Sequence, residues 1–147
     1  MAGKAYSQIY FHMVFATKYR EPVITYDFEW DLYTFMKKKL KELGCTPLII
    51  NGMPDHVHVL FRGKRDVSIS KVAKFIKGSS SRWINENELT KEHFSWQVGY
   101  SVFSVSDYRL QIVFQYIKNQ KTHHREESLI PSLECTASAS DGLKSIV

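Results

Sequence analysis

Hydrophobic residues along this chain recur with two different spacings, and the order of these spacings is the strongest constraint on the fold. Alternation typical of strands covers 7–16, 45–51, 56–62 and 96–104. Helical spacing covers three further stretches, from 25 or 27 to 43, from 68 or 70 to 85, and 107–122. The order β-α-β-β-α-β plus a helix predicts an α+β protein with the ferredoxin-like split βαβ arrangement. We expect an antiparallel sheet with helices mainly on one face and an extra C-terminal helix.

The length of 147 residues suits one domain. We expect that domain to span 1–130. After Pro131 the chain loses its aromatic residues and gains small polar ones, which predicts a flexible tail over 131–147. No apolar run approaches the roughly 20 residues that span a bilayer, and a signal peptide is not evident, so we expect a cytoplasmic protein without a membrane partner. Cys45 and Cys135 are too few and too far apart to indicate a disulfide framework or a zinc site.

Positive charge is concentrated in one stretch of the chain. The formal net charge is +5, and residues 62–82 hold seven basic side chains against the single acid Asp66. The basic residues are Arg62, Lys64, Arg65, Lys71, Lys74, Lys77 and Arg82. Such a stripe predicts a nucleic-acid partner, although a solvated helix face would have the same composition. On the second helix, Gly78 lies within the basic arc and Phe75 at its border, where it would either stack on a base or edge the core.

Two histidines stand two residues apart on the third expected strand. Because side chains of a strand alternate between faces, His56 and His58 project from one face, opposite the face that the helices cover. Two neutral imidazoles side by side form half of a divalent-metal site, but surface histidines would show the same pattern. His12 on the first strand is an alternative third ligand or a supporting group. Asp55 and Asn51 belong to the adjoining turn, unless they orient a histidine.

The last expected helix carries Tyr116 and Gln120, which lie one turn apart and therefore on one face. A tyrosine hydroxyl has a pKa of about 10, so it becomes a nucleophile only with help from a metal or a base. A glutamine oxygen one turn away would complete a metal shell. The alternative interpretation is a core tyrosine beside a glutamine that faces solvent.

Five segments taken in order carry a resemblance to a known family. They are HMVFATKYR at 12–20, PDHVHVL at 54–60, KGSSSR at 77–82, WQVGY at 96–100 and YIKNQ at 116–120. In this order and spacing, over roughly 6–125, the chain resembles the one-tyrosine HUH transposases of the smallest bacterial insertion sequences and their relatives associated with REP repeats.

The resemblance implies a function and a role for each site residue. Tyr116 would be the nucleophile that cleaves and rejoins single-stranded DNA through a 5′-phosphotyrosine link. His56, His58 and Gln120 would bind Mg²⁺ or Mn²⁺. The expected DNA partner has hairpins near the ends of the element, and the enzyme would work as a homodimer whose tyrosine helix can complete the partner's site. Two alternatives stay open: a non-catalytic module that binds single-stranded DNA or RNA, and a domesticated relative that processes chromosomal repeats.

Overall fold

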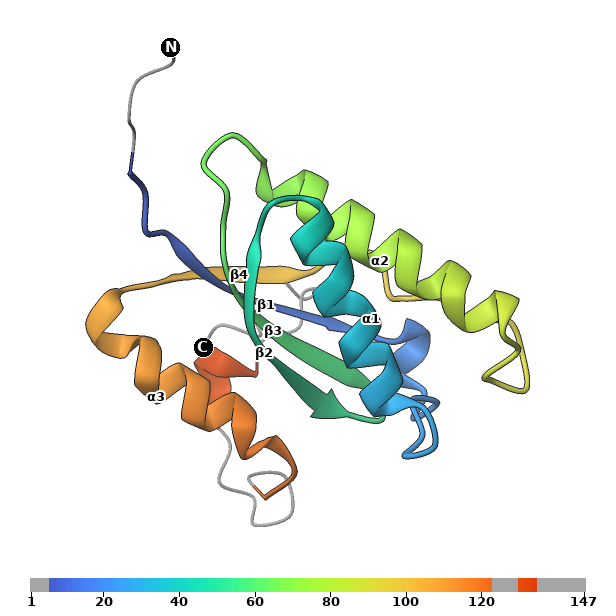
Figure 1. The fold of residues 1–147 in the computed structure, drawn as a ribbon. Coiled ribbons are helices and arrows are strands. Elements are labelled where there is room, and N and C mark those ends of the chain that lie inside the picture. The colour runs from blue at the N-terminus through green and yellow to red at the C-terminus, as the bar shows by residue number, and fades with distance from the viewer. Residues whose placement is uncertain (1–5, 123–129, 135–147) are drawn as a thin grey trace.

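A computed structural model provides the structure, which describes residues 6–122 and 130–134 (Figure 1). The strands are β1 (Tyr10–Ala16), β2 (Thr46–Met53), β3 (His56–Arg62) and β4 (Ser101–Val105). The α-helices are α1 (Glu29–Glu42), α2 (Ile69–Glu86) and α3 (Asp107–Lys118). Two short 3₁₀ turns are η1 (Lys18–Arg20) and η2 (Pro131–Leu133).

The four strands form one antiparallel sheet in the order β2-β3-β1-β4. β1 and β3 lie at the centre, and their register pairs Val14 with His58 and His12 with Leu60. The two βαβ halves are therefore interleaved, as the order of elements predicts. The α+β, ferredoxin-like prediction is confirmed, and the central position of β3 places its two histidines deep in the molecule.

Helices α1 and α2 cover one face of the sheet (Figure 1). The strand residues beneath them are apolar, among them Met13, Phe15 and Phe61, all at most 1% exposed. Acidic residues in the first turn of α1 and lysines in its last turn suit the helix dipole. The Ser68 side chain caps α2 by accepting a hydrogen bond from the Lys71 amide at 3.1 Å. This face supplies the main hydrophobic core.

Helix α3 and the turn η2 lie on the opposite face of the sheet (Figure 1). Their contacts form a smaller apolar cluster that consists of Leu60, Val113, Tyr116, Ile117 and Leu133. The first residues of the predicted tail are thus packed against the sheet. Residues 123–129 and 135–147 lie outside the described residues, so the predicted flexibility of 135–147 stays a prediction.

The last strand is shorter, and the last helix less regular, than the sequence patterns predict. The last strand begins at Ser101, because Gly99 has a φ of +95° and the chain before it leaves the sheet. Trp96 instead forms an isolated bridge with Thr17. The continuous part of α3 ends at Lys118. A turn at Asn119 interrupts the helix, and Gln120 lies in the helical residues 120–122 that follow. Among the described residues, no helix combines the length and apolar character needed to cross a membrane.

Candidate active site

The two histidines of β3 lie side by side beneath α3. His56 begins the strand, and alternation places the His58 side chain on the same face, with ring centroids 5.1 Å apart. Both side chains are at most 2% exposed. The alternation of the strand therefore gives the shared face that the sequence predicts, but the histidines are buried rather than on the surface.

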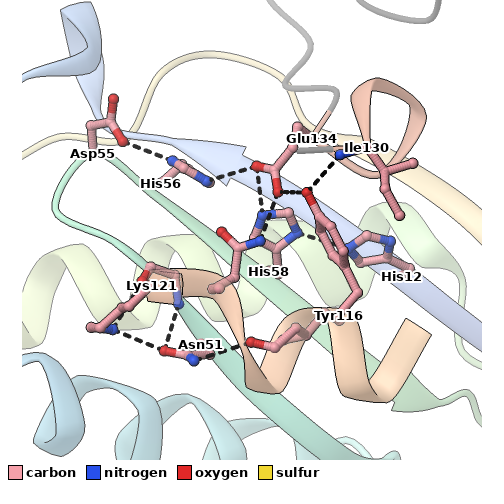
Figure 2. Close-up of polar contacts among 12 residues, drawn as sticks. His12, Asn51, Asp55, His56, His58, Tyr116, Lys121, Ile130 and Glu134 are labelled. Atoms are coloured by element: carbon pink, nitrogen blue, oxygen red, sulfur yellow. Dashed lines mark hydrogen bonds and ion pairs between the residues drawn. The ribbon is translucent and has the colours of Figure 1, made fainter. Parts of the chain in front are cut away.

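Each of these histidines has its Nδ1 atom engaged on the side away from the site. His56 Nδ1 lies 2.7 Å from Asp55 Oδ1, and Asp55 also forms an ion pair with Arg20 at 3.1 Å. His58 Nδ1 lies 2.9 Å from His12 Nε2 (Figure 2). Such outer partners fix the ring orientation, so both Nε2 atoms point into the site.

Asp55 and His12 differ in charge. Burial raises the pKa of Asp55, but its hydrogen bond and charge interaction with His56 and the Arg20 guanidinium outweigh this and lower it to about 2, which keeps it anionic. Burial, followed by the electrostatic effect of the adjacent His58 ring, lowers the pKa of His12 to about 3, so this imidazole is neutral. His56 lies between two carboxylates, and despite its burial they raise its pKa.

Asn51 of β2 attaches the end of α3 to the sheet. Its amide nitrogen donates to the carbonyl oxygens of Ile117 and Lys118 at 3.1 and 3.2 Å. Its side-chain oxygen accepts from Lys121 Nζ at 3.0 Å (Figure 2). Asn51 pairs with His58 in the sheet register, so this anchor fixes the last turn of α3 over the histidines. Asn51 thus positions the helix, because its side chain bonds to the end of α3 and to Lys121 beyond it.

Tyr116 and Gln120 project from this anchored end toward the histidines. The Tyr116 side chain is buried, and its hydroxyl accepts a hydrogen bond from the Ile130 amide at 3.1 Å. Gln120, just beyond the turn at Asn119, is fully buried. The structure therefore brings together the four residues that the sequence predicts for the site, from two elements of the fold.

The carboxylate of Glu134 lies at the centre of this group (Figure 2). Its Oε1 atom is 3.1 Å from Nε2 of both His56 and His58. Its Oε2 atom accepts hydrogen bonds from the Tyr116 hydroxyl and, at 2.6 Å, from Gln120 Nε2. One side chain from the C-terminal segment thus contacts all four predicted site residues.

The donor atoms suit a divalent cation. Ligand atoms of His56, His58 and Glu134 all lie within 4.8 Å of one another. Two imidazole nitrogens and a carboxylate oxygen are ligands that transition metals accept, and the carboxylate also suits the harder Mg²⁺ and Mn²⁺. The neutral His12 places no positive charge behind His58. These residues therefore fit a metal site.

The surroundings of Glu134 and Tyr116 shift their pKa values in opposite directions. Burial raises the pKa of Glu134, but hydrogen bonds from both imidazoles outweigh burial and hold it well below its usual range. Burial, followed by the hydrogen bond to the Glu134 carboxylate, raises the pKa of Tyr116 above its ordinary value. The tyrosine is therefore a neutral donor to an anionic carboxylate in this state.

The basic stripe does not join the histidines and Tyr116. Lys71, Lys74 and Arg82 lie on α2, which packs on the other face of the sheet. With Phe75, Gly78 and Ser79 they line a hollow of about 540 Å³, and a side chain at Gly78 would meet nothing within 4 Å. Lys77 donates instead to the carbonyl oxygens of Gln97 and Gly99 at 2.9 and 2.7 Å. Its desolvation lowers its pKa.

The remaining basic residues of the stripe surround the end of β3. Arg62 donates to the Ser7 carbonyl oxygen at 2.5 Å, and Lys64 forms an ion pair with Asp66 at 2.6 Å. Together with Arg65 they line a second, smaller hollow near Gly63. The predicted DNA-binding residues therefore fall into two groups, and Lys77 is held by the protein itself.

Sequence reasoning missed Glu134 because it lies in the segment interpreted as a flexible tail. The one signal that could have found it is the run Ile130, Pro131 and Leu133, where two apolar residues flank a helix-starting proline. His12 was considered as a metal ligand, but in the structure it contacts a histidine rather than the centre of the site.

Comparisons with known proteins find similarity in both sequence and fold. Residues 5–120 match the family model described as IS200-like transposase. The chain is 25% identical over 130 residues to the ISDra2 transposase TnpA of Deinococcus radiodurans. The aligned region covers 84% of this chain and 91% of that protein. A crystal structure of a candidate transposase from the same organism is similar, with a TM-score of 0.66, 26% identity and coverage of 82% and 96%. The REP-associated tyrosine transposase bound to a REP hairpin shares the fold, with a TM-score of 0.55, 16% identity and coverage of 96% and 94%.

Proposed function

Because the chain belongs to the family of IS200-like transposases, we propose that it cleaves and rejoins single-stranded DNA through a covalent link to Tyr116. The observation that carries this proposal is the convergence of the Tyr116 hydroxyl and both β3 imidazoles on one small carboxylate. This convergence places a nucleophilic hydroxyl beside a candidate cation site, which is the arrangement that attack on a scissile phosphate needs. The transposase assignment makes the reaction a strand transfer rather than a simple hydrolysis.

The proposed step forms one bond to phosphorus and breaks another. The Tyr116 oxygen attacks the phosphorus in line, and the bond to the 3′ oxygen breaks. The tyrosine proton departs along its hydrogen bond to Glu134, while the leaving oxygen takes a proton from water and becomes a 3′-hydroxyl. The DNA end remains as a 5′-phosphotyrosine. A second 3′-hydroxyl reverses the step on new DNA, because the phosphodiester energy is conserved in the tyrosine ester.

We assign the cation site to His56 and His58, together with Gln120, the third ligand that the resemblance implies. A bound Mg²⁺ or Mn²⁺ would neutralise charge on the phosphate as it reacts. Asp55 and His12 hold the two imidazoles by their Nδ1 atoms, which would leave each Nε2 atom to bind the ion. Manganese suits the nitrogen-rich part of the shell, and magnesium suits its oxygen ligands.

We assign hairpin binding to the exposed basic residues, with Lys71, Lys74 and Arg82 on α2 as one group and the end of β3 as the other. The REP-associated relative was solved with a REP hairpin, which suggests folded single strands as substrates to test. Because α2 lies on the far face of the sheet, DNA bound there would have to pass around an edge to reach Tyr116. Lys77 is left out of this assignment, because its ammonium group already donates to two carbonyl oxygens of the protein.

The test is a covalent adduct assay. We would mix the purified chain and Mn²⁺ or Mg²⁺ with single strands tiled across both flanks of its gene, and read denaturing gels for a protein band shifted by DNA. We expect a metal-dependent adduct on one strand, absent from Tyr116→Phe. Tyr108→Phe is the matched control, because this tyrosine on the same helix is 83% exposed. Tight binding with no adduct under any ion would instead favour the non-catalytic binding module.

The homodimer and the use of Tyr116 in a partner's site remain proposals that one mixing experiment separates. Tyr116→Phe and His58→Ala should each be inactive alone. If each site is built within one chain, as the shared contact with Glu134 favours, the mixture stays inactive. Recovery of adduct in the mixture would show that sites are completed between subunits. An adduct on strands from the chromosomal repeats alone would favour the domesticated role.

A further inference from the structure

The C-terminal segment 130–134 is built into the site rather than lying beside it. Leu133 is buried in the apolar cluster beneath α3, with Leu60 and Val113 among its neighbours. The Ile130 amide donates to the Tyr116 hydroxyl, and the next turn of chain brings Glu134 over the histidines (Figure 2). A buried leucine and a backbone hydrogen bond therefore determine where the Glu134 carboxylate lies.

Resting on the function proposed above, we propose that Glu134 is a further ligand of the same cation, delivered by this docked segment. Its Oε1 atom is 3.1 Å from each histidine Nε2. Neighbouring ligands of an octahedral ion lie roughly 3 Å apart when each is about 2.1 Å from the metal. Glu134 Oε1 thus already has, from each imidazole nitrogen, the spacing of a neighbouring ligand on one ion, and all three donor atoms lie within 4.8 Å of one another.

The chemistry of the donor set supports a carboxylate in this place. Two neutral imidazoles contribute no charge to a divalent cation, and Mg²⁺ and Mn²⁺ prefer oxygen ligands. Glu134 is the one carboxylate that the structure brings within reach of both Nε2 atoms, among the residues it describes. Its anionic oxygen would lower the net charge of the site and strengthen binding of the ion.

The second carboxylate oxygen has a separate task. Glu134 Oε2 accepts from the Tyr116 hydroxyl and from Gln120 Nε2, so Gln120 steadies the carboxylate while the tyrosine is held beside the metal ligands. If His56, His58, Gln120 and Glu134 are the four protein ligands, an octahedral ion keeps two positions for phosphate oxygens. Metal binding and docking of the segment are then coupled, because each provides part of the other's binding site.

The first measurement is the affinity of the full chain for Mn²⁺ by isothermal titration calorimetry, without DNA. We expect Glu134→Gln to weaken binding at least about tenfold, by analogy with the loss of a supporting metal-site group. Glu86→Gln is the matched control, since this glutamate lies on the exposed side of α2 and should leave the affinity unchanged. His58→Ala marks the loss expected for an inner ligand.

The second measurement is hydrogen exchange at the Leu133 and Glu134 amides, both of which donate to the Ile130 carbonyl oxygen. We expect Mn²⁺ to slow their exchange in the wild-type chain and to have no effect in Glu134→Gln. Circular dichroism establishes that the variant is folded. This readout reports on the docked segment even where the calorimetric signal is small.

The outcomes distinguish this inference from the proposed function. If Glu134→Gln binds Mn²⁺ as tightly as the wild type, Glu134 is not a ligand, while the adduct assay can still succeed. Tighter binding by the variant would also overturn the inference and show that the carboxylate competes with the ion. Failure of the wild type to bind Mn²⁺ overturns the metal site itself, and with it both proposals.

Discussion

The two faces of the sheet are made by the same strands but have opposite character. On the face toward α1 and α2, β1 and β3 present an almost purely apolar surface. On the face toward α3, they present His12, His56 and His58, all at most 1% exposed, with a much smaller apolar cluster beside them. Buried polar groups contribute little net stability, whereas apolar burial dominates it. The comparison indicates that one face stabilises the fold and the other holds the candidate active site.

The largest effect should come from breaking the apolar face. Phe61 is fully buried against this core, so Phe61→Ala should lower the free energy of unfolding by about 3–5 kcal/mol. Tyr116→Phe on the other face should lower it by only about 1 kcal/mol, the usual contribution of a hydrogen bond. Urea denaturation followed by circular dichroism measures both. Equal losses would show that the two faces share the work of stabilisation.

Loss of Asp55, which contacts His56 Nδ1, should affect metal binding more than folding. Asp55→Asn removes the anion that holds His56 Nδ1, and we expect a loss of roughly 10–100-fold in Mn²⁺ affinity. Calorimetric titration of the variant measures this. Asp31→Asn, an exposed position in the first turn of α1, is the control for loss of one negative charge. An unchanged affinity in Asp55→Asn would assign Asp55 to the turn alone.

Asn51, which anchors α3 to the sheet, should affect both the stability of the fold and adduct formation. Asn51→Ala leaves the carbonyl oxygens of Ile117 and Lys118 without their side-chain donor, which should cost about 1–2 kcal/mol of unfolding free energy. Because the same anchor places Tyr116, adduct formation should fall further than the loss of stability explains at a temperature where the variant is fully folded. Single-turnover rates measured there provide the check. A rate equal to that of the wild type would contradict the positioning role.

The smallest effect should be found on α2. Lys71→Ala combined with Lys74→Ala removes two exposed charges, and the slope of log binding constant against log salt should fall by about 1.5–2. Lys77→Ala should leave this slope nearly unchanged, because Lys77 already donates to Gln97 and Gly99 carbonyl oxygens. Fluorescence anisotropy with a hairpin strand at several salt concentrations compares the two variants. Equal slopes for both would mean that DNA does not bind along this helix.

Local periodicity was enough to predict much of this molecule. Strand alternation placed His56 and His58 on one face, and helical spacing placed Tyr116 and Gln120 on one side of the last helix. The order of the elements predicted the ferredoxin-like sheet and the core face. These features are determined by the sequence because side chains within one element keep a fixed angular relation to their near neighbours. The motifs that carry the family resemblance lie within such elements.

Only the tertiary structure decided which distant residues meet at the site. His12 contacts His58 across 46 residues, Asn51 reaches α3 across 66, and Glu134 reaches His58 across 76. No periodicity relates residues so far apart; their meeting depends on strand order and on the packing of α3 and Leu133 against the sheet. The segment that holds Glu134 has the composition of a tail. Its position depends on contacts with the rest of the fold, so its own sequence does not reveal it.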